Sequence, residues 1–174
     1  MSSAAPLVVP GLTGRTVLVT AAGTAHGTAQ SLVLLASGAE VIATGDETAL
    51  PPSLVDAGTG LPGALAFRSL GPGWASVADW IGEHHAGLDG VVLNAEAELP
   101  DALLAQLVPD AAVVQLAGAG SARPTDAFRW NRVVPPAGEP SRGDAERAAG
   151  VVAFLLSELA HPVHGAELPL RIRA

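Results

Sequence analysis

The stretch GLTGRTVLVTAAGTAHGTAQSLVLLASGAEVIAT, residues 11–44, decides the fold. Its β-branched segment at 15–20 (RTVLVT) ends at a turn that contains glycine, and residues 26–37 (HGTAQSLVLLAS) then show helical periodicity up to Gly38. A second short apolar segment, residues 40–44 (EVIAT), follows directly. The stretch therefore predicts a strand, a glycine-bearing turn, a helix and a second strand.

The rest of the chain continues this alternation. Between the second and third strands, the Gly- and Pro-rich residues 45–63 are expected to hold at most one irregular helical turn. Ser141 and Asp144 have the spacing of a capping box at the head of a helix. Strands that are continuously apolar and alternate with helices predict a parallel sheet covered on both faces. Further strands are expected at 64–70, 89–94, 111–116, 128–134 and 166–172, and further helices at 74–86, at 101–107 and from 141 to about 159.

Composition limits the class of protein. The 174 residues are 49% hydrophobic, which suits one domain, residues 1–174, with a sizeable core. The net charge of -8 disfavours binding to nucleic-acid phosphates, and the lack of Cys excludes thiolate chemistry. No apolar run approaches the ~20 residues of a membrane span, and Pro6 and Pro10 interrupt the N-terminal apolar run, which argues against a signal peptide. We expect a cytoplasmic protein with no nucleic-acid or membrane partner.

Four segments resemble the short-chain dehydrogenase/reductase family. Residues 11–44 are similar to its opening, which carries the turn T-G-x-x-x-G-x-G, and DGVVLNA (89–95) resembles its N-N-A-G strand. FRWNRVVPP (128–136) resembles the strand that usually ends in V-x-P-G, and residues 148–172 resemble the closing helix and strand. The resemblance implies an α/β, Rossmann-like, doubly wound and mostly parallel sheet of about seven strands. It also implies helices on both faces, with the part between the fourth and sixth strands reduced.

The same resemblance implies an NAD or NADP site at the first turn, held in part by Ala21, Thr24, His26 and Gly27. Ala21 and Ala25 stand where the family has its first two motif glycines, while Gly27 keeps the third. Glycines let the backbone approach a pyrophosphate at the helix N-terminus, so each added Cβ narrows that space. The alternative for Gly27 is that it only packs the helix onto the sheet.

Two further residues, Asp46 and Asn94, complete the candidate nucleotide site. Asp46 lies near the end of the second strand, where the family binds the ribose, although a loop carboxylate in solvent is the alternative reading. Asn94 keeps its place in the N-N-A-G motif, while Glu96 replaces the final glycine. The helix N-terminus would lower the pKa of His26 and keep its imidazole neutral. The neutral ring would then serve as an anion contact or as a general base. The alternative is that His26 is a solvent-facing turn residue.

The family's reaction groups are missing. The sequence has no Tyr and its nine basic residues are all Arg, whereas the family uses a Tyr and a Lys as its proton donor and helper. The family's Ser position falls on Ala117 or Gly118, and residues 117–127 are too few for the long helix expected there. The sequence therefore predicts no catalytic residue of the family type and no metal site.

These losses lead to two hypotheses about function. The first is a non-redox binding or structural subunit, a homodimer or a heterodimer with a full-length short-chain dehydrogenase. Because the closing helix and strand resemble those that pair across a dimer axis in the family, the partner would bind through residues 145–172. The alternative is an enzyme: an NAD(P)-dependent oxidoreductase completed by a partner chain, or a non-redox catalyst that uses the cleft.

Overall fold

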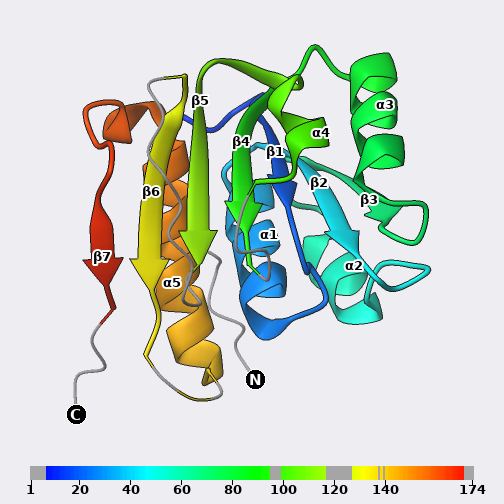
Figure 1. Cartoon of the computed structure of the whole chain (residues 1–174). Helices are drawn as coiled ribbons and strands as arrows, with labels where there is room; N and C mark the ends of the chain where they lie inside the picture. The colour runs from blue at the N-terminus through cyan, green and yellow to red at the C-terminus, as the bar shows by residue number, and fades with distance from the viewer. Residues whose placement is uncertain (1–6, 95–98, 117–126, 137, 139, 171–174) are drawn as a thin grey trace.

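The computed structural model describes residues 7–94, 99–116, 127–136, 138 and 140–170 (Figure 1). Strands and helices alternate along the chain, as the sequence predicts. The strands are β1 (Thr16–Val19), β2 (Glu40–Gly45), β3 (Ala64–Ser69), β4 (Leu88–Leu93), β5 (Leu107–Leu116), β6 (Arg129–Val134) and β7 (Glu167–Pro169). The α-helices are α1 (Ala25–Ala36), α2 (Pro52–Gly58), α3 (Trp74–His84), α4 (Asp101–Leu104) and α5 (Arg142–Leu156), followed by a 3-10 turn at Glu158–Ala160.

The strands form one sheet in the order β3-β2-β1-β4-β5-β6-β7. Every adjacent pair of these strands is parallel, so the predicted mostly parallel sheet is parallel throughout its described strands. The order reverses between β1 and β4, and all the arrowheads in Figure 1 end at one edge of the sheet. In sheets of this kind ligands bind at that edge, next to the point of reversal.

Alternate residues of the strands build two cores. Val17, Val19 and Val92 face α1 and α5, which lie behind the sheet in Figure 1. Leu18 and Val91 face the other way, toward α3 and α4. The predicted helices on both faces are therefore confirmed, and none of the helices in the described ranges is long and apolar enough to cross a membrane.

Three elements, α2, α4 and β5, differ in extent from the prediction. α2 has seven residues rather than one irregular turn, because Pro52 stands at a position of the first turn that proline favours and Leu54 is fully buried against the fold. α4 has only four residues, and β5 begins at Leu107 rather than at residue 111. The register of β4 and β5 shifts between Leu88 and Gly90, so the early part of β5 bulges.

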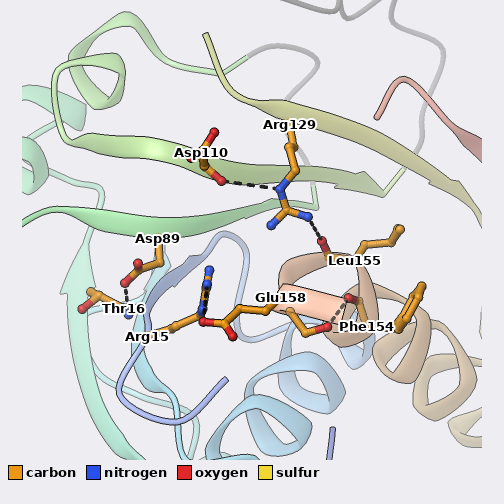
Figure 2. Close-up of polar contacts among 9 residues, drawn as sticks. Arg15, Thr16, Asp89, Asp110, Arg129, Phe154, Leu155 and Glu158 are labelled. Carbon is orange, nitrogen blue, oxygen red and sulfur yellow. Dashed lines mark hydrogen bonds and ion pairs between the residues drawn. The ribbon is translucent and has the colours of Figure 1, made fainter. Parts of the chain in front are cut away.

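Polar contacts fasten the other edge of the sheet, where the strands begin (Figure 2). The buried Arg129 donates to the carbonyl oxygen of Leu155 at 3.3 Å and to that of Asp110 at 3.4 Å. Arg15 pairs with Glu158 at 3.0 Å. These contacts tie the end of α5 to the starts of the strands, which leaves the edge where the strands end as the place for a site.

Candidate functional site

The turn from β1 to α1 lies at the point of reversal and is held by both neighbouring strands. The N–H of Thr20 donates to Val92 at 3.0 Å, and the N–H of Ala22 donates to Thr44 at 2.9 Å. Thr24 is the N-cap of α1, and its Oγ1 accepts from the N–H of Gly27 at 3.1 Å and donates to the carbonyl of Ala21 at 2.8 Å. The turn is thus a rigid loop that opens a helix.

The N-terminus of α1 offers donors to an anion. The N–H of Gly27 already donates to Thr24 Oγ1. The N–H groups of Ala25 and His26, which precede Gly27 in the helix, remain as donors. Ala25 is exposed. A phosphate at such a helix start would gain these donors and the favourable end of the helix dipole.

The turn accommodates alanine at residue 21 but requires glycine at residue 27. Ala21 has φ +47°, the left-handed region that favours glycine. A Cβ added at Gly27 would overlap the carbonyl oxygen of Ala21 and would lie 2.7 Å from Ala22 Cα. Gly27 is therefore required for the close contact between helix and turn, a packing role that is compatible with the predicted role beside a nucleotide.

Asn94 joins β4, the turn and α1. Its N–H donates to Thr20 Oγ1 at 2.9 Å, and its Nδ2 donates to the Thr20 carbonyl at 2.8 Å and to Gln30 Oε1 at 2.7 Å. Gln30 is fully buried, and both Gln30 Nε2 and Asn94 Oδ1 are buried without a hydrogen-bond partner. Buried polar atoms are rarely left unpaired, so these two atoms point to a polar group that the protein chain does not supply.

Gln30 was not predicted from the sequence. The only sequence sign was a long polar side chain among apolar residues of the helix 26–37, four residues after His26. That spacing places His26 and Gln30 on the same side of α1.

His26 is half-buried as the second residue of α1, not a solvent-facing turn residue. Its Nδ1 is buried and has no partner. Burial lowers the pKa of His26, and the charge of Asp144 on α5 acts in the opposite direction. The predicted direction of the pKa shift is confirmed, but its main cause is burial rather than the helix N-terminus.

Glu47, rather than Asp46, lies against the turn. A Cβ added at Gly23 would overlap Glu47 Oε1, and one added at Gly45 would overlap Glu47 Oε2. The carboxylate therefore sits between the first turn and the end of β2, about 20 residues after Gly27, where dinucleotide-binding sheets place the acid that binds the ribose. Asp46 precedes it in the chain, and both residues are exposed.

Some predicted positions fall outside the described residues. Ala117 and Gly118, at the family's Ser position, and Glu96, in the N-N-A-G motif, are among them. Within the ranges that the structure describes, no group of His, Asp and Glu side chains has the arrangement of a metal site.

No protein-family model matches the chain, and no curated protein sequence matches it. Solved structures do resemble it. A short-chain dehydrogenase/reductase from Brucella melitensis, a glucose/ribitol dehydrogenase, has a TM-score of 0.70 and 20% identity, covering 92% of this chain and 96% of its own. The chain has the fold of the short-chain dehydrogenases.

Two other proteins with the short-chain dehydrogenase fold are equally similar in structure. A hydroxysteroid dehydrogenase from Escherichia coli has a TM-score of 0.73 at 14% identity, covering 91% of this chain and 96% of its own. The NADH-dependent reductase A1-R′, solved in complex with NAD, has a TM-score of 0.71 at 17% identity, covering 92% of this chain and 96% of its own. The likeness shows that the resemblance in the sequence extends to the tertiary structure.

Proposed function

We propose that this chain is a degenerate member of the short-chain dehydrogenase/reductase family that binds a dinucleotide and acts as a non-redox subunit of a dimer. One observation carries the non-redox part: the sequence has neither Tyr nor Lys. The family's reduction needs a titratable proton donor at hydrogen-bond distance from the carbonyl, and Tyr with Lys is its means of providing one. The fold is kept while these groups are lost.

The geometry at the end of β1 supports dinucleotide binding. The N–H groups of Ala25 and His26 would hold the pyrophosphate, the Glu47 carboxylate would accept hydrogen bonds from the adenosine ribose, and Gln30 and Asn94 supply unpaired polar atoms nearby. A bound NADH would supply a hydride donor, but this chain has no family-type proton donor of its own to complete the reduction of a carbonyl. The NAD complex of the similar reductase A1-R′ supports the choice of ligand.

Glu47 favours NAD over NADP. A 2′-phosphate on the ribose would lie against the Glu47 carboxylate, and two anions at contact distance repel each other. NADP-selective proteins of this architecture place Arg at that position instead.

Thermal unfolding in the presence of NAD, NADH, NADP and NADPH tests the binding proposal. NAD or NADH at a hundred times its Kd should stabilise the protein by about 2.7 kcal/mol, while NADP and NADPH should not. Glu47→Arg should reverse this preference, and Asp56→Arg, at an exposed residue of α2, is the control for the change of charge. If none of the four nucleotides raises the melting temperature of the folded protein, the binding proposal is wrong.

A partner surface on α5 and the residues after it is the second part of the proposal. Phe154 and Leu159 are 40% and 57% exposed, and both lie within the predicted interface, residues 145–172. Leu7, 55% exposed, adjoins this surface, because a Cβ added at Gly150 would lie 2.8 Å from Leu7 Cδ2. An exposed apolar surface of this kind is typical of a protein–protein contact. The occupant is a second copy or a full-length short-chain dehydrogenase.

Co-purification of the native protein with its partner tests the enzyme alternative. If a complete dehydrogenase co-purifies with the chain, NADH oxidation by the isolated chain, the isolated partner and the complex can be compared. Activity that requires this chain's own nucleotide site, and is lost in Glu47→Arg, would replace the non-redox proposal with the alternative of an oxidoreductase completed by its partner.

A further inference from the structure

His26 occupies an unusual place for an imidazole. It is the second residue of α1, at the helix end that would face the pyrophosphate, and it is half-buried with an unpartnered Nδ1. An imidazole there is neutral or cationic depending on what lies next to it. A diphosphate is the strongest negative charge that the proposed site would receive.

The protein itself supplies little negative charge to His26. The elements packed on α1 are α5, α2, β2 and β1. Their charged residues are Arg142, Asp144, Glu146 and Arg147 on α5, Asp56 on α2 and Glu40 on β2, and Glu47 lies beside the turn. Among these, the charge of Asp144 acts on His26.

The Asp144 carboxylate already has hydrogen-bond and ion-pair partners at the start of its own helix. It accepts from Ser141 Oγ at 2.6 Å and from the Ser141 N–H at 3.2 Å, and it pairs with Arg147 at 2.6 Å. The carboxylate is thus paired with Arg147 and oriented by the capping box, and no hydrogen bond joins it to His26 Nδ1. Among the residues that the structure describes, Asp144 therefore acts on His26 through its charge and not through a hydrogen bond.

We propose that binding of a dinucleotide at the N-terminus of α1 is accompanied by proton uptake at the imidazole of His26. This inference rests on the proposed function. The proton comes from the buffer and goes to the free imidazole nitrogen, and no other bond forms or breaks. The resulting imidazolium faces the diphosphate and adds a cation to the neutral N–H groups of Ala25 and His26.

The sign of the pH dependence follows from this exchange. In the free protein burial lowers the pKa of His26, so the ring is neutral at pH 7. The diphosphate raises that pKa, so the complex holds more protons than the free protein and affinity increases as pH falls. One pKa unit corresponds to about tenfold in affinity, so we expect the Kd for NAD to decrease by up to about tenfold from pH 8 to pH 6.

Isothermal titration of the full chain with NAD, in buffers with different heats of ionisation, measures the proton uptake directly. For a pKa rise of one unit we expect an uptake of about half a proton for the wild type midway between the free and bound pKa values. We expect none for His26→Gln, and the wild-type value for His161→Gln, which removes an exposed imidazole near the end of α5. The His26 ring C–H resonance in the wild type, followed against pH with and without NAD, gives the same answer without a variant.

The outcomes distinguish a failure of this inference from a failure of the proposed function on which it rests. NAD binding without proton uptake, or with an unchanged uptake in His26→Gln, overturns the role of His26 and leaves the nucleotide site standing. Failure of any nucleotide to bind between pH 6 and pH 8 overturns the proposed function, and this inference with it.

Discussion

At the scale of single residues, the first turn carries an uncommon backbone. Ala21 has φ +47°, where an L-residue other than glycine is strained by about 1–2 kcal/mol. The resembled family has glycine at this position. The strain persists because Thr24 Oγ1 donates to the Ala21 carbonyl and because the N–H of the next residue is bonded to β2.

Replacing Ala21 by glycine should therefore stabilise the protein by up to about 1 kcal/mol, because the relief of strain exceeds the added entropy of the unfolded glycine. Ala22→Gly is the matched control, since Ala22 is fully buried and lies outside the left-handed region. We expect it to destabilise. Urea denaturation of both variants checks the pair, and a loss of stability in Ala21→Gly would contradict the strain.

At residue 27, where glycine is already present, a side chain should destabilise the protein. A Cβ at this position would overlap the Ala21 carbonyl, so Gly27→Ala should destabilise the protein by about 1–3 kcal/mol through overpacking. Gly82→Ala is the control, because Gly82 is an exposed residue inside α3 and its added Cβ would come no closer than 3.5 Å to Gln106. Alanine there should stabilise by about 0.5–1 kcal/mol. Equal effects at the two glycines in a denaturation series would rule out the packing role.

At the scale of elements, both ends of α5 are fastened by polar side chains. Ser141 and Asp144 form the capping box at its start. At its end Arg129, from the neighbouring strand β6, donates to the carbonyl of Leu155. A cation at a helix C-terminus also interacts favourably with the helix dipole, which helps the fold to keep a guanidinium that is only 7% exposed.

Removing that guanidinium should be costly. Arg129→Met keeps an apolar stem but leaves the carbonyls of Leu155 and Asp110 without their donor, so we expect a loss of about 2–3 kcal/mol. Arg142→Met is the control, because Arg142 is exposed and its pair with Glu146 is an ordinary surface pair worth about 0.5 kcal/mol or less. Chemical denaturation measures both, and a similar small loss in each would show that Arg129 does not hold α5.

The capping box at the start of α5 should make the stability of the protein depend on pH in the acid range. Hydrogen bonds from Ser141, and then the contact with Arg147, lower the pKa of Asp144. A carboxyl whose pKa is lower in the folded state stabilises above its unfolded pKa, near 3.8, and loses that contribution as pH falls through the folded value. Asp144→Asn should therefore be less stable than wild type at pH 7 and should approach it as the pH falls below 3.8 and through the lowered pKa.

Thermal unfolding from pH 2 to pH 7 follows this difference. Asp56→Asn, at an exposed residue of α2, controls for the loss of one negative charge. A gap between Asp144→Asn and wild type that stays constant down to pH 2 would show that the ionised carboxylate is not what stabilises the helix start.

At the scale of the whole molecule, α5 and the 3-10 turn after it carry the exposed apolar side chains Phe154 and Leu159. If these form the proposed contact, wild type should be a dimer in light scattering at micromolar concentration. Phe154→Asp should dissociate it while leaving the fold intact, and Val55→Asp, at a residue that is 45% exposed on α2, should not. A Phe154→Asp variant that remains dimeric would contradict the proposed surface. A monomeric wild type would exclude a second copy as its occupant and leave the full-length dehydrogenase.

The order of elements is largely a local property, and the sequence predicted it. Continuous β-branched segments such as residues 15–20 become strands because both their faces are buried, and Ser141 with Asp144 forms a capping box because the two residues lie one helical turn apart. The extent of α2 and α4 was predicted poorly. It depends on burial against distant elements, as Leu54 shows, and a short segment reveals little of that.

The sequence by itself determined that this chain is a parallel α/β domain with a glycine-bearing first turn and without Tyr or Lys. Only the tertiary structure decided which side chains meet at that turn. The fold places the Glu47 carboxylate against Gly23. It also joins Gln30 by a hydrogen bond to Asn94, which lies 64 residues further along the chain. Such contacts depend on how β1, β2, β4 and α1 pack in space, and periodicity describes only the face on which a residue lies, not its neighbour across the fold.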